Sequence, residues 1–127
     1  MTRIMVVDDE SDTLDVMKLF LELSGYQACT TLNSTDALTL AEMEHPDCIL
    51  LDVMMPRLDG FGLCKMMRAH PATNQLPIMF VTAYSPMDLE DRRREVGADM
   101  VLMKPFGMDA LIASVEKALA LRRQVAV

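Results

Sequence analysis

The sequence has 127 residues, of which 51% are hydrophobic and 24% charged, and its formal net charge at pH 7 is −7. This length fits one compact domain with its own core, and the composition is too apolar for a disordered chain. The negative charge argues against binding to nucleic acid or to anionic membranes, no apolar run is long enough to span a bilayer, and the amino terminus lacks the pattern of a secretory signal. We therefore expect a single cytoplasmic domain over residues 1–127.

Short apolar or β-branched runs alternate along the chain with longer segments of helical periodicity, a pattern that is typical of an α/β protein. The third and fourth runs show little alternation of polar and apolar residues, as expected for central parallel strands that helices cover on both faces. Five strands are expected, at Arg3–Val7, Gln27–Thr31, Cys48–Leu51, Ile78–Thr82 and Met100–Met103.

Each expected strand is followed by a segment with helix start and stop signals. The first helix should begin near Ser11, where several side chains could cap it, and should end at Gly25, with Leu14 and Leu23 in its apolar stripe. The remaining helices are expected at residues 34–44 with Ser34 as the cap, 60–69, 87–95 and 108–122. Right-handed crossovers between these strands and helices produce a doubly wound parallel sheet with five helices on its two faces.

Three residue types could indicate other kinds of site, but a structural role is favoured for each. The three cysteines have no CxxC spacing and no nearby histidine pair, so we expect reduced thiols rather than a disulfide or a zinc site. Most of the thirteen methionines lie at core-facing spacings and are expected to fill the core. The arginines at residues 92–94 are expected to form a solvated helix face.

Polar side chains follow four of the expected strands at the point where each strand ends. The first strand runs into Asp8, Asp9 and Glu10, the third into Asp52, the fourth into Thr82 and the fifth into Lys104. Each residue alone has an ordinary explanation, such as capping or turn formation. In a doubly wound sheet, however, these ends meet at one edge. The converging carboxylates would raise at least one pKa unless a cation bound among them, and such oxygens suit Mg2+.

These residues resemble the signature of response regulator receiver domains, which are CheY-like, and the similarity spans almost the whole chain. It is carried, in order, by Asp8-Asp9, the segment DVMMPRLDG at residues 52–60, Thr82-Ala83 and Lys104-Pro105-Phe106. The resemblance implies a flavodoxin-like sheet with strand order 2-1-3-4-5 and a cis peptide bond before Pro105. A nucleotide-binding function is disfavoured, because the chain has neither a GxGxxG nor a GxxxxGK[ST] motif.

The resemblance implies a phosphoacceptor role for Asp52 in two-component signalling. Asp52 would take a phosphoryl group from a histidine of a sensor histidine kinase or of a histidine phosphotransfer protein. Asp9, Asp52 and the backbone carbonyl of Met54 would hold Mg2+, and Asp8 would act on the ion directly or through a water. The chain would thus be a signalling phosphoprotein that catalyses only its own phosphorylation and dephosphorylation.

The resemblance also assigns the groups that bind the phosphoryl oxygens, namely the Lys104 ammonium, the Thr82 hydroxyl and the Ala83 amide. Movement of Thr82 toward the phosphoryl group would shift the fourth helix and the neighbouring strand. The fourth helix, fifth strand and fifth helix are therefore the expected face for a downstream protein target or for a second copy of the chain. No direct contact with nucleic acid or membrane is expected.

Three positions are expected either to depart from the family pattern or to affect how fast the acyl phosphate is hydrolysed. Many receivers have an aromatic residue three places before the lysine, where this chain has Val101, so an aromatic rotamer switch is not expected there. Tyr84 could take over part of the signalling, or it could be a surface tyrosine without that role. Met54 and Tyr84 occupy the two positions that tune hydrolysis of the acyl phosphate, and since neither is a base or a water-orienting amide, a long phosphoryl lifetime is predicted.

Two other functions fit the sequence less well. A receiver-like module that binds a partner without phosphorylation would not need a carboxylate cluster that is costly to bury. A magnesium-dependent phosphohydrolase with Asp52 as nucleophile would need a cap or a substrate pocket, for which the chain has no spare elements. The sequence leaves open whether this is a stand-alone receiver or one domain of a longer regulator, and it indicates neither the cognate kinase, nor the output pathway, nor the oligomeric state.

Overall fold

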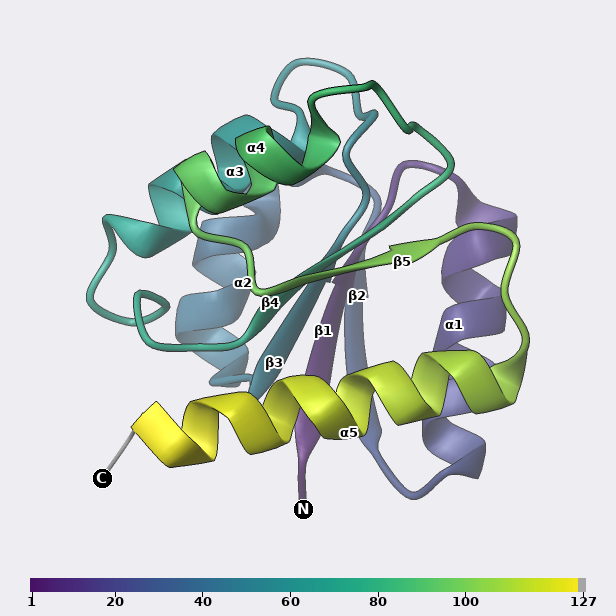
Figure 1. The fold of residues 1–127 in the computed structure, drawn as a ribbon. Helices are drawn as coiled ribbons and strands as arrows, with labels where there is room; N and C mark the ends of the chain where they lie inside the picture. Colours follow the sequence, from purple (N-terminus) through teal and green to yellow (C-terminus); the bar gives the residue numbers. More distant parts are fainter. Residues whose placement is uncertain (126–127) are drawn as a thin grey trace.

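The computed structural model describes the backbone of residues 1–125 and the side chains of residues 1–121. Five parallel strands form one sheet in the order β2-β1-β3-β4-β5, with helices on both faces (Figure 1). The strands are β1 (Arg3–Val7), β2 (Gln27–Thr31), β3 (Cys48–Leu51), β4 (Ile78–Thr82) and β5 (Met100–Met103). The strand ranges and their order agree with the sequence-based expectation, which confirms the doubly wound α/β fold.

Two helices cover one face of the sheet and three cover the other (Figure 1). The first layer holds α1 (Ser11–Leu23) and α5 (Met108–Val125). The second holds α2 (Ala37–Glu44), which a 3-10 turn η1 (Ser34–Asp36) precedes, α3 (Gly60–Arg68) and α4 (Leu89–Val96). Among the described residues, no helix combines the length and apolarity needed to cross a membrane.

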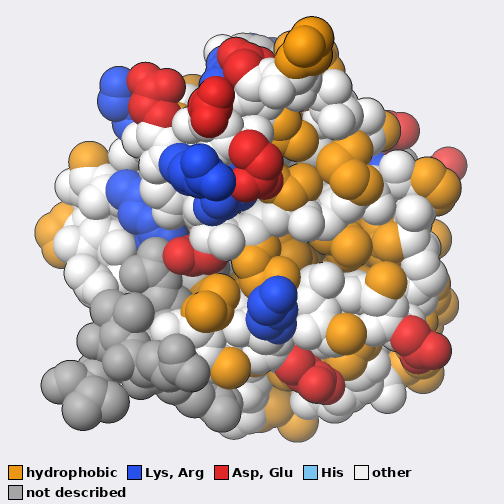
Figure 2. All heavy atoms as spheres, viewed as in Figure 1, with side chains coloured by type: hydrophobic (Ala, Val, Ile, Leu, Met, Phe, Trp, Pro, Cys, Tyr) orange, Lys and Arg blue, Asp and Glu red, His pale blue; other side chains and the backbone are white. Residues whose placement is uncertain are grey.

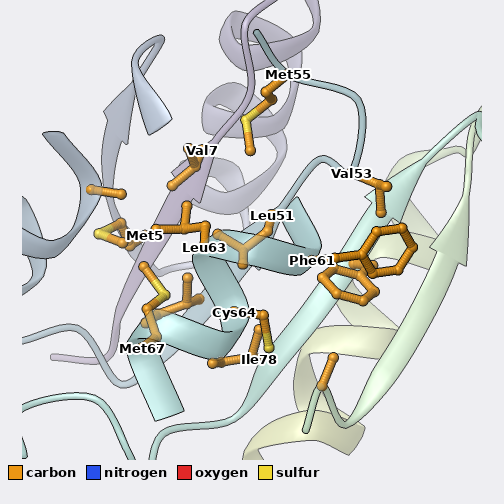
Figure 3. Close-up of a cluster of buried hydrophobic side chains, with 14 of the residues drawn as sticks. Met5, Val7, Leu51, Val53, Met55, Phe61, Leu63, Cys64, Met67 and Ile78 are labelled. Atoms are coloured by element: carbon orange, nitrogen blue, oxygen red, sulfur yellow. The ribbon is translucent and has the colours of Figure 1, made fainter. Parts of the chain in front are cut away.

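The sheet separates two hydrophobic clusters, because successive side chains of a strand point to opposite faces. On the side of α2, α3 and α4, Met5, Val7 and Leu51 of the sheet pack with Leu63 and Met67 of α3 (Figure 3). Every residue of β3 and β4 is buried, as expected for strands covered on both faces. The core therefore holds the ends of these two strands in fixed positions.

The helix α1 begins at Ser11 as expected, but its capping and the starts of α2 and α4 differ from the expectation. The N-cap residue of α1 is Glu10, which makes no capping bond through its side chain within the described structure. Ser34 lies in η1 and donates its hydroxyl to the Pro56 carbonyl at 3.4 Å instead of capping the helix. Residues before α4 form a turn, so that α4 begins at Leu89 rather than at Met87. A tertiary acceptor, as at Pro56, competes with local capping, and sequence patterns do not reveal it.

The prediction that most methionines fill the core is wrong. Five of the thirteen are buried, whereas seven are exposed. The exposed ones include Met54 beside the edge of the sheet where the polar residues converge, Met87 in the turn before α4, and Met103 at the end of β5. Leu23, expected in the apolar stripe of α1, is also 68% exposed. The surface thus carries more apolar side chains than periodicity indicated.

The prediction of a solvated arginine face is correct only for Arg94, which is exposed. Arg92 lies over the ring of Phe61, and Arg93 is bonded to Glu90 and to a backbone carbonyl. Arg92 thus connects α4 to α3, while the bonds of Arg93 lie within α4 and the turn that follows it.

The three cysteines, Cys29, Cys48 and Cys64, are free thiols, as the sequence predicts. Burial raises the pKa of Cys48 to about 12 and that of Cys29 to about 11. At neutral pH both thiols are therefore protonated and weakly nucleophilic, which fits a structural role.

Candidate functional site

The C-terminal ends of four strands bring the predicted site residues together. Asp8 follows β1, Asp52 follows β3, Thr82 ends β4 and Lys104 follows β5. Because the strands are parallel, these ends meet at one edge of the sheet. The hollow at this edge is lined by Asp9, Glu10, Asp52, Met54, Thr82, Ala83, Tyr84 and Lys104.

Lys104 joins two buried carboxylates. Its Nζ donates to Asp8 Oδ2 at 2.7 Å and to Asp52 Oδ2 at 3.2 Å, while its backbone amide donates to the Thr82 carbonyl at 3.0 Å. Asp8 is 1% exposed and Asp52 is 5% exposed. Burial alone would lower the pKa of Lys104, but the hydrogen bond and charge of Asp8, with the charge of Asp52, raise it above its ordinary value. The ammonium is therefore charged at neutral pH.

The carboxylates at this edge influence one another. Burial raises the pKa of Asp8 above its ordinary value, and the negative charge of Asp52 acts in the same direction. The hydrogen bonds from Lys104 and from the Glu10 amide oppose this rise without cancelling it. The direction of the pKa change at Asp8 agrees with the prediction, but its largest cause is burial rather than the expected repulsion between carboxylates.

Four carboxylates could hold a metal ion. Single ligand oxygens of Asp8, Asp9, Glu10 and Asp52 all lie within 4.8 Å of one another. Asp9 and Glu10 are exposed, so waters can complete the coordination, and an all-oxygen set of this kind fits a hard divalent cation. Glu10 was expected at this edge of the sheet from its position directly after two aspartates, but it was not predicted to bind the metal ion.

Thr82 is held by its own loop. It is fully buried, and its hydroxyl oxygen accepts the Tyr84 amide at 3.0 Å, while Ala83 between them is exposed. Thr82 lines the same hollow as Asp52. It is therefore positioned at the site but engaged by the segment that leads into α4.

The loop from β3 to α3 folds back onto the strand that ends in Asp52. The Gly60 amide donates to the Val53 carbonyl at 2.8 Å, and a Cβ on Gly60 would collide with the carbonyl oxygen of Asp52. Asp59 caps α3 by accepting the Gly62 amide at 2.8 Å. Glycine at position 60 thus allows the close approach that fixes the backbone of Asp52.

Two further expectations have different outcomes. The Lys104–Pro105 peptide bond is cis, as the resemblance implied. The Met54 amide donates to Asp52 Oδ1 at 3.4 Å, which places this residue beside the cluster. A metal-binding role for the Met54 carbonyl stays a prediction.

Comparisons with known proteins identify relatives of the chain. Residues 4–116 match the family described as the response regulator receiver domain. The chain is 40% identical over 121 residues to the transcriptional regulatory protein PrrA of Mycobacterium tuberculosis, a match that covers 95% of this chain and 51% of PrrA. It is 38% identical over 119 residues to the probable transcriptional regulator ycf27 of Cyanophora paradoxa, covering 92% of this chain and 48% of that protein. The chain thus spans about half the length of these relatives.

Solved structures agree with this similarity over nearly the full length of the chain. The chemotaxis protein CheY4 of Vibrio cholerae superposes with a TM-score of 0.89 at 27% identity, covering 93% of this chain and 98% of CheY4. A putative response regulator of Chloroflexus aurantiacus superposes with a TM-score of 0.87 at 33% identity, covering 94% of this chain and 98% of that one.

Proposed function

The chain belongs to the response regulator receiver domain family of two-component signalling, and from this premise we propose that it acts as one receiver unit over residues 1–127 that accepts a phosphoryl group on Asp52. The observation that carries the proposal is the Lys104 ammonium bonded to both Asp8 and Asp52 within a cluster of four carboxylates. Burying these charged groups costs free energy, and this cost favours a chemical role for the cluster over a purely structural one.

The proposed reaction is a transfer between two side chains. A carboxylate oxygen of Asp52 attacks the phosphorus of a phosphohistidine on a sensor kinase or phosphotransfer protein, so that a P–O bond forms and the P–N bond breaks. Lys104 neutralises the incoming phosphoryl oxygens, and the Thr82 hydroxyl and Ala83 amide donate hydrogen bonds to them. Mg2+, held by Asp9 and Asp52 with Asp8 and the Met54 carbonyl, would supply further charge neutralisation when bound.

A charge count supports the need for each group. Asp8, Asp9 and Asp52 contribute about −3, and a divalent cation with Lys104 contributes about +3, so an anionic donor can approach. After transfer Asp52 is an acyl phosphate whose carboxyl group no longer carries a charge, and the phosphoryl group carries about −2, which leaves a net charge of about −1. Hydrogen-bond donors at the edge of the site must then turn toward the phosphoryl group. Thr82, whose hydroxyl accepts the Tyr84 amide, is the donor proposed to move.

The proposed output is a change in the face formed by α4, β5 and α5. On this face, hydrophobic side chains gather between the charged surface of α4 and the start of α5 (Figure 2). Met87, Met103 and Met108 are exposed in these segments. An apolar surface of this kind suits a downstream protein or a second copy of the chain.

The test is to incubate the protein with Mg2+ and acetyl phosphate and to determine the intact mass. We expect a gain of one phosphoryl group that Asp52→Ala abolishes, while Asp36→Ala, which removes an exposed carboxylate on η1, preserves it. Absence of an adduct with both acetyl phosphate and the cognate kinase would overturn the proposal in favour of a binding module. Multiple turnover of a small phosphoester would overturn it in favour of a hydrolase.

A further inference from the structure

The C-terminal end of α4 is fastened to its surroundings. Arg68, at the end of α3, donates from Nε to the Gly97 carbonyl at 2.8 Å and pairs through Nη2 with Asp99 at 2.9 Å. Arg93 donates from Nη1 to the Ala98 carbonyl at 2.7 Å. The turn after α4 is therefore tied to α3 and to the start of β5, and this end of the helix is a fixed point.

The N-terminal end of α4 is held, among the described residues, by the packing of Leu89, which is 8% exposed and lies in the core, rather than by side-chain hydrogen bonds of the kind found at the other end. The N-cap residue Asp88 makes no capping bond through its side chain within the described structure, and Met87 is fully exposed. The segment before them includes Tyr84, whose amide is bonded to the Thr82 hydroxyl. A movement of Thr82 toward a phosphoryl group would therefore act on the N-terminal end of the helix.

Between these two ends, the guanidinium of Arg92 lies over an aromatic ring. Its Cζ is 3.8 Å from the centroid of Phe61, which is only 5% exposed. Phe61 in turn stands edge-on to Phe80, with 5.3 Å between the ring centroids and an interplanar angle of 83°. A cation over the face of a ring is attracted by the ring quadrupole, so this contact holds α4 against α3.

The ring beneath Arg92 belongs to the rigid part of the site. Phe61 directly follows Gly60, which is bonded to Val53 and packed against the backbone of Asp52. Phe80 is in β4, two residues before Thr82, and every residue of β4 is buried. Arg92 thus connects α4, the helix that is proposed to move, with the buried elements that position the phosphoacceptor Asp52.

We propose that the contact of Arg92 with Phe61 is a latch that holds α4 in its unphosphorylated position and so opposes phosphorylation of Asp52. The inference rests on the proposed function. If the N-terminal end of α4 follows Thr82, Arg92 leaves the ring, and the contact is lost only in the phosphorylated state. By thermodynamic reciprocity, removing the guanidinium favours phosphoryl binding. Arg92 is therefore a positioning residue, and its link to Phe61 and Phe80 does not use position 101, where the chain has valine.

The test compares two arginines of the same helix. Arg92→Ala and Arg94→Ala remove the same charge, but Arg94 is exposed and lies over no aromatic ring among the described residues. Affinity for beryllofluoride, a phosphoryl mimic, is measured by 19F NMR in the presence of Mg2+. We expect Arg92→Ala to bind it about two- to fivefold more tightly, the range that an exposed cation–π contact supports, and Arg94→Ala to match wild type.

A double-mutant cycle identifies the ring as the partner. In a Phe61→Leu background, Arg92→Ala should have no further effect on beryllofluoride affinity. An effect of equal size in both backgrounds, unchanged or weaker binding by Arg92→Ala, or an equal gain in Arg94→Ala overturns the latch. If wild type still gains one phosphoryl group on Asp52 in these cases, the proposed function stands. Absence of both adduct and beryllofluoride binding in wild type overturns the proposed function itself, and the latch with it.

Discussion

Arg57 adopts a left-handed backbone conformation, with φ of 70°, in the loop between β3 and α3. A residue with a Cβ is strained in this region, whereas glycine is not. We expect Arg57→Gly to raise the free energy of unfolding by up to about 1 kcal/mol, because the strain relieved exceeds the added entropy of the unfolded chain. Urea denaturation measures the change. In the same assay Arg94→Gly, within α4, should lower the value by about 1 kcal/mol, and a loss at both positions would contradict the argument.

Met54 is 57% exposed and lines the hollow beside Asp52. Its thioether is a poor partner for a water that attacks the acyl phosphate, whereas an amide could orient that water. On the proposed function, Met54→Asn should therefore speed phosphate loss by roughly two- to tenfold, the effect of one hydrogen bond in the transition state. The decay of the phosphorylated mass over time gives the rate. Met66→Asn changes an exposed methionine of α3 outside this hollow and should leave the rate unchanged. Faster loss in wild type than in Met54→Asn would contradict the prediction.

At the level of single residues, the sequence predicted the members of the site better than their surroundings. The positions of Asp8, Asp52, Thr82 and Lys104 followed from one rule, that parallel strands end at the same edge. The hydrogen bond from the Tyr84 amide to the Thr82 hydroxyl could not be predicted in this way, because it depends on the path of one loop. The exposure of the methionines was also not predictable, since periodicity shows which positions share a face but not whether another element covers that face.

At the level of elements, strands were predicted more accurately than helix starts. The strands are short apolar runs bounded by polar or turn residues, and burial on both faces makes β3 and β4 apolar throughout. Helix starts depend on which acceptor a hydroxyl or amide finds. Ser34 finds the carbonyl of Pro56, which is 22 residues away in the sequence, and so it does not cap a helix. A long-range partner of this kind explains the error at α2, whereas before α4 the chain forms a local turn in which the Leu89 amide donates to the Pro86 carbonyl at 3.1 Å.

The side chain of Arg68 joins the C-terminal end of α3 to the loop before β4 and to the turn between α4 and β5. Arg68 is bonded to the carboxylate of Asp99, which also accepts the Ile78 amide at 2.9 Å. The guanidinium also donates to the backbone carbonyls of Thr73, Asn74, Leu76 and Gly97. The Arg68 side chain is 16% exposed and that of Asp99 is 20% exposed, so solvent replaces these bonds poorly.

Arg68→Met should therefore lower the free energy of unfolding by roughly 2–4 kcal/mol, since it leaves several largely buried acceptors without their donor. The control is Lys65→Met, which removes an exposed charge one turn earlier in the same helix and should change stability by less than about 0.5 kcal/mol. Both values come from urea denaturation. Equal effects of the two substitutions would show that the arginine contributes no more than surface charge.

At the level of the whole molecule, the candidate site exists only in the folded chain. Asp8 and Lys104 are 96 residues apart in the sequence, yet their side chains are 2.7 Å apart. Folding therefore concentrates carboxylates of an already acidic chain at one edge of the sheet, where Asp8 and Asp52 are buried. Lys104 offsets part of this repulsion, and a bound divalent cation would offset more. A cation that binds only the folded state must also stabilise it.

Magnesium should accordingly raise the melting temperature of the protein. At a concentration tenfold above its dissociation constant the ion would add about 1.4 kcal/mol, which corresponds to a rise of roughly 3–8 °C for a domain of this size. Differential scanning calorimetry with MgCl2, compared with NaCl at equal ionic strength, separates specific binding from charge screening. Asp9→Asn removes a proposed ligand and should lose this response, while Glu116→Gln, on the exposed side of α5, should keep it. Equal shifts with both salts, or an unchanged response in Asp9→Asn, would show that the ion acts on the net charge of the protein rather than at this cluster.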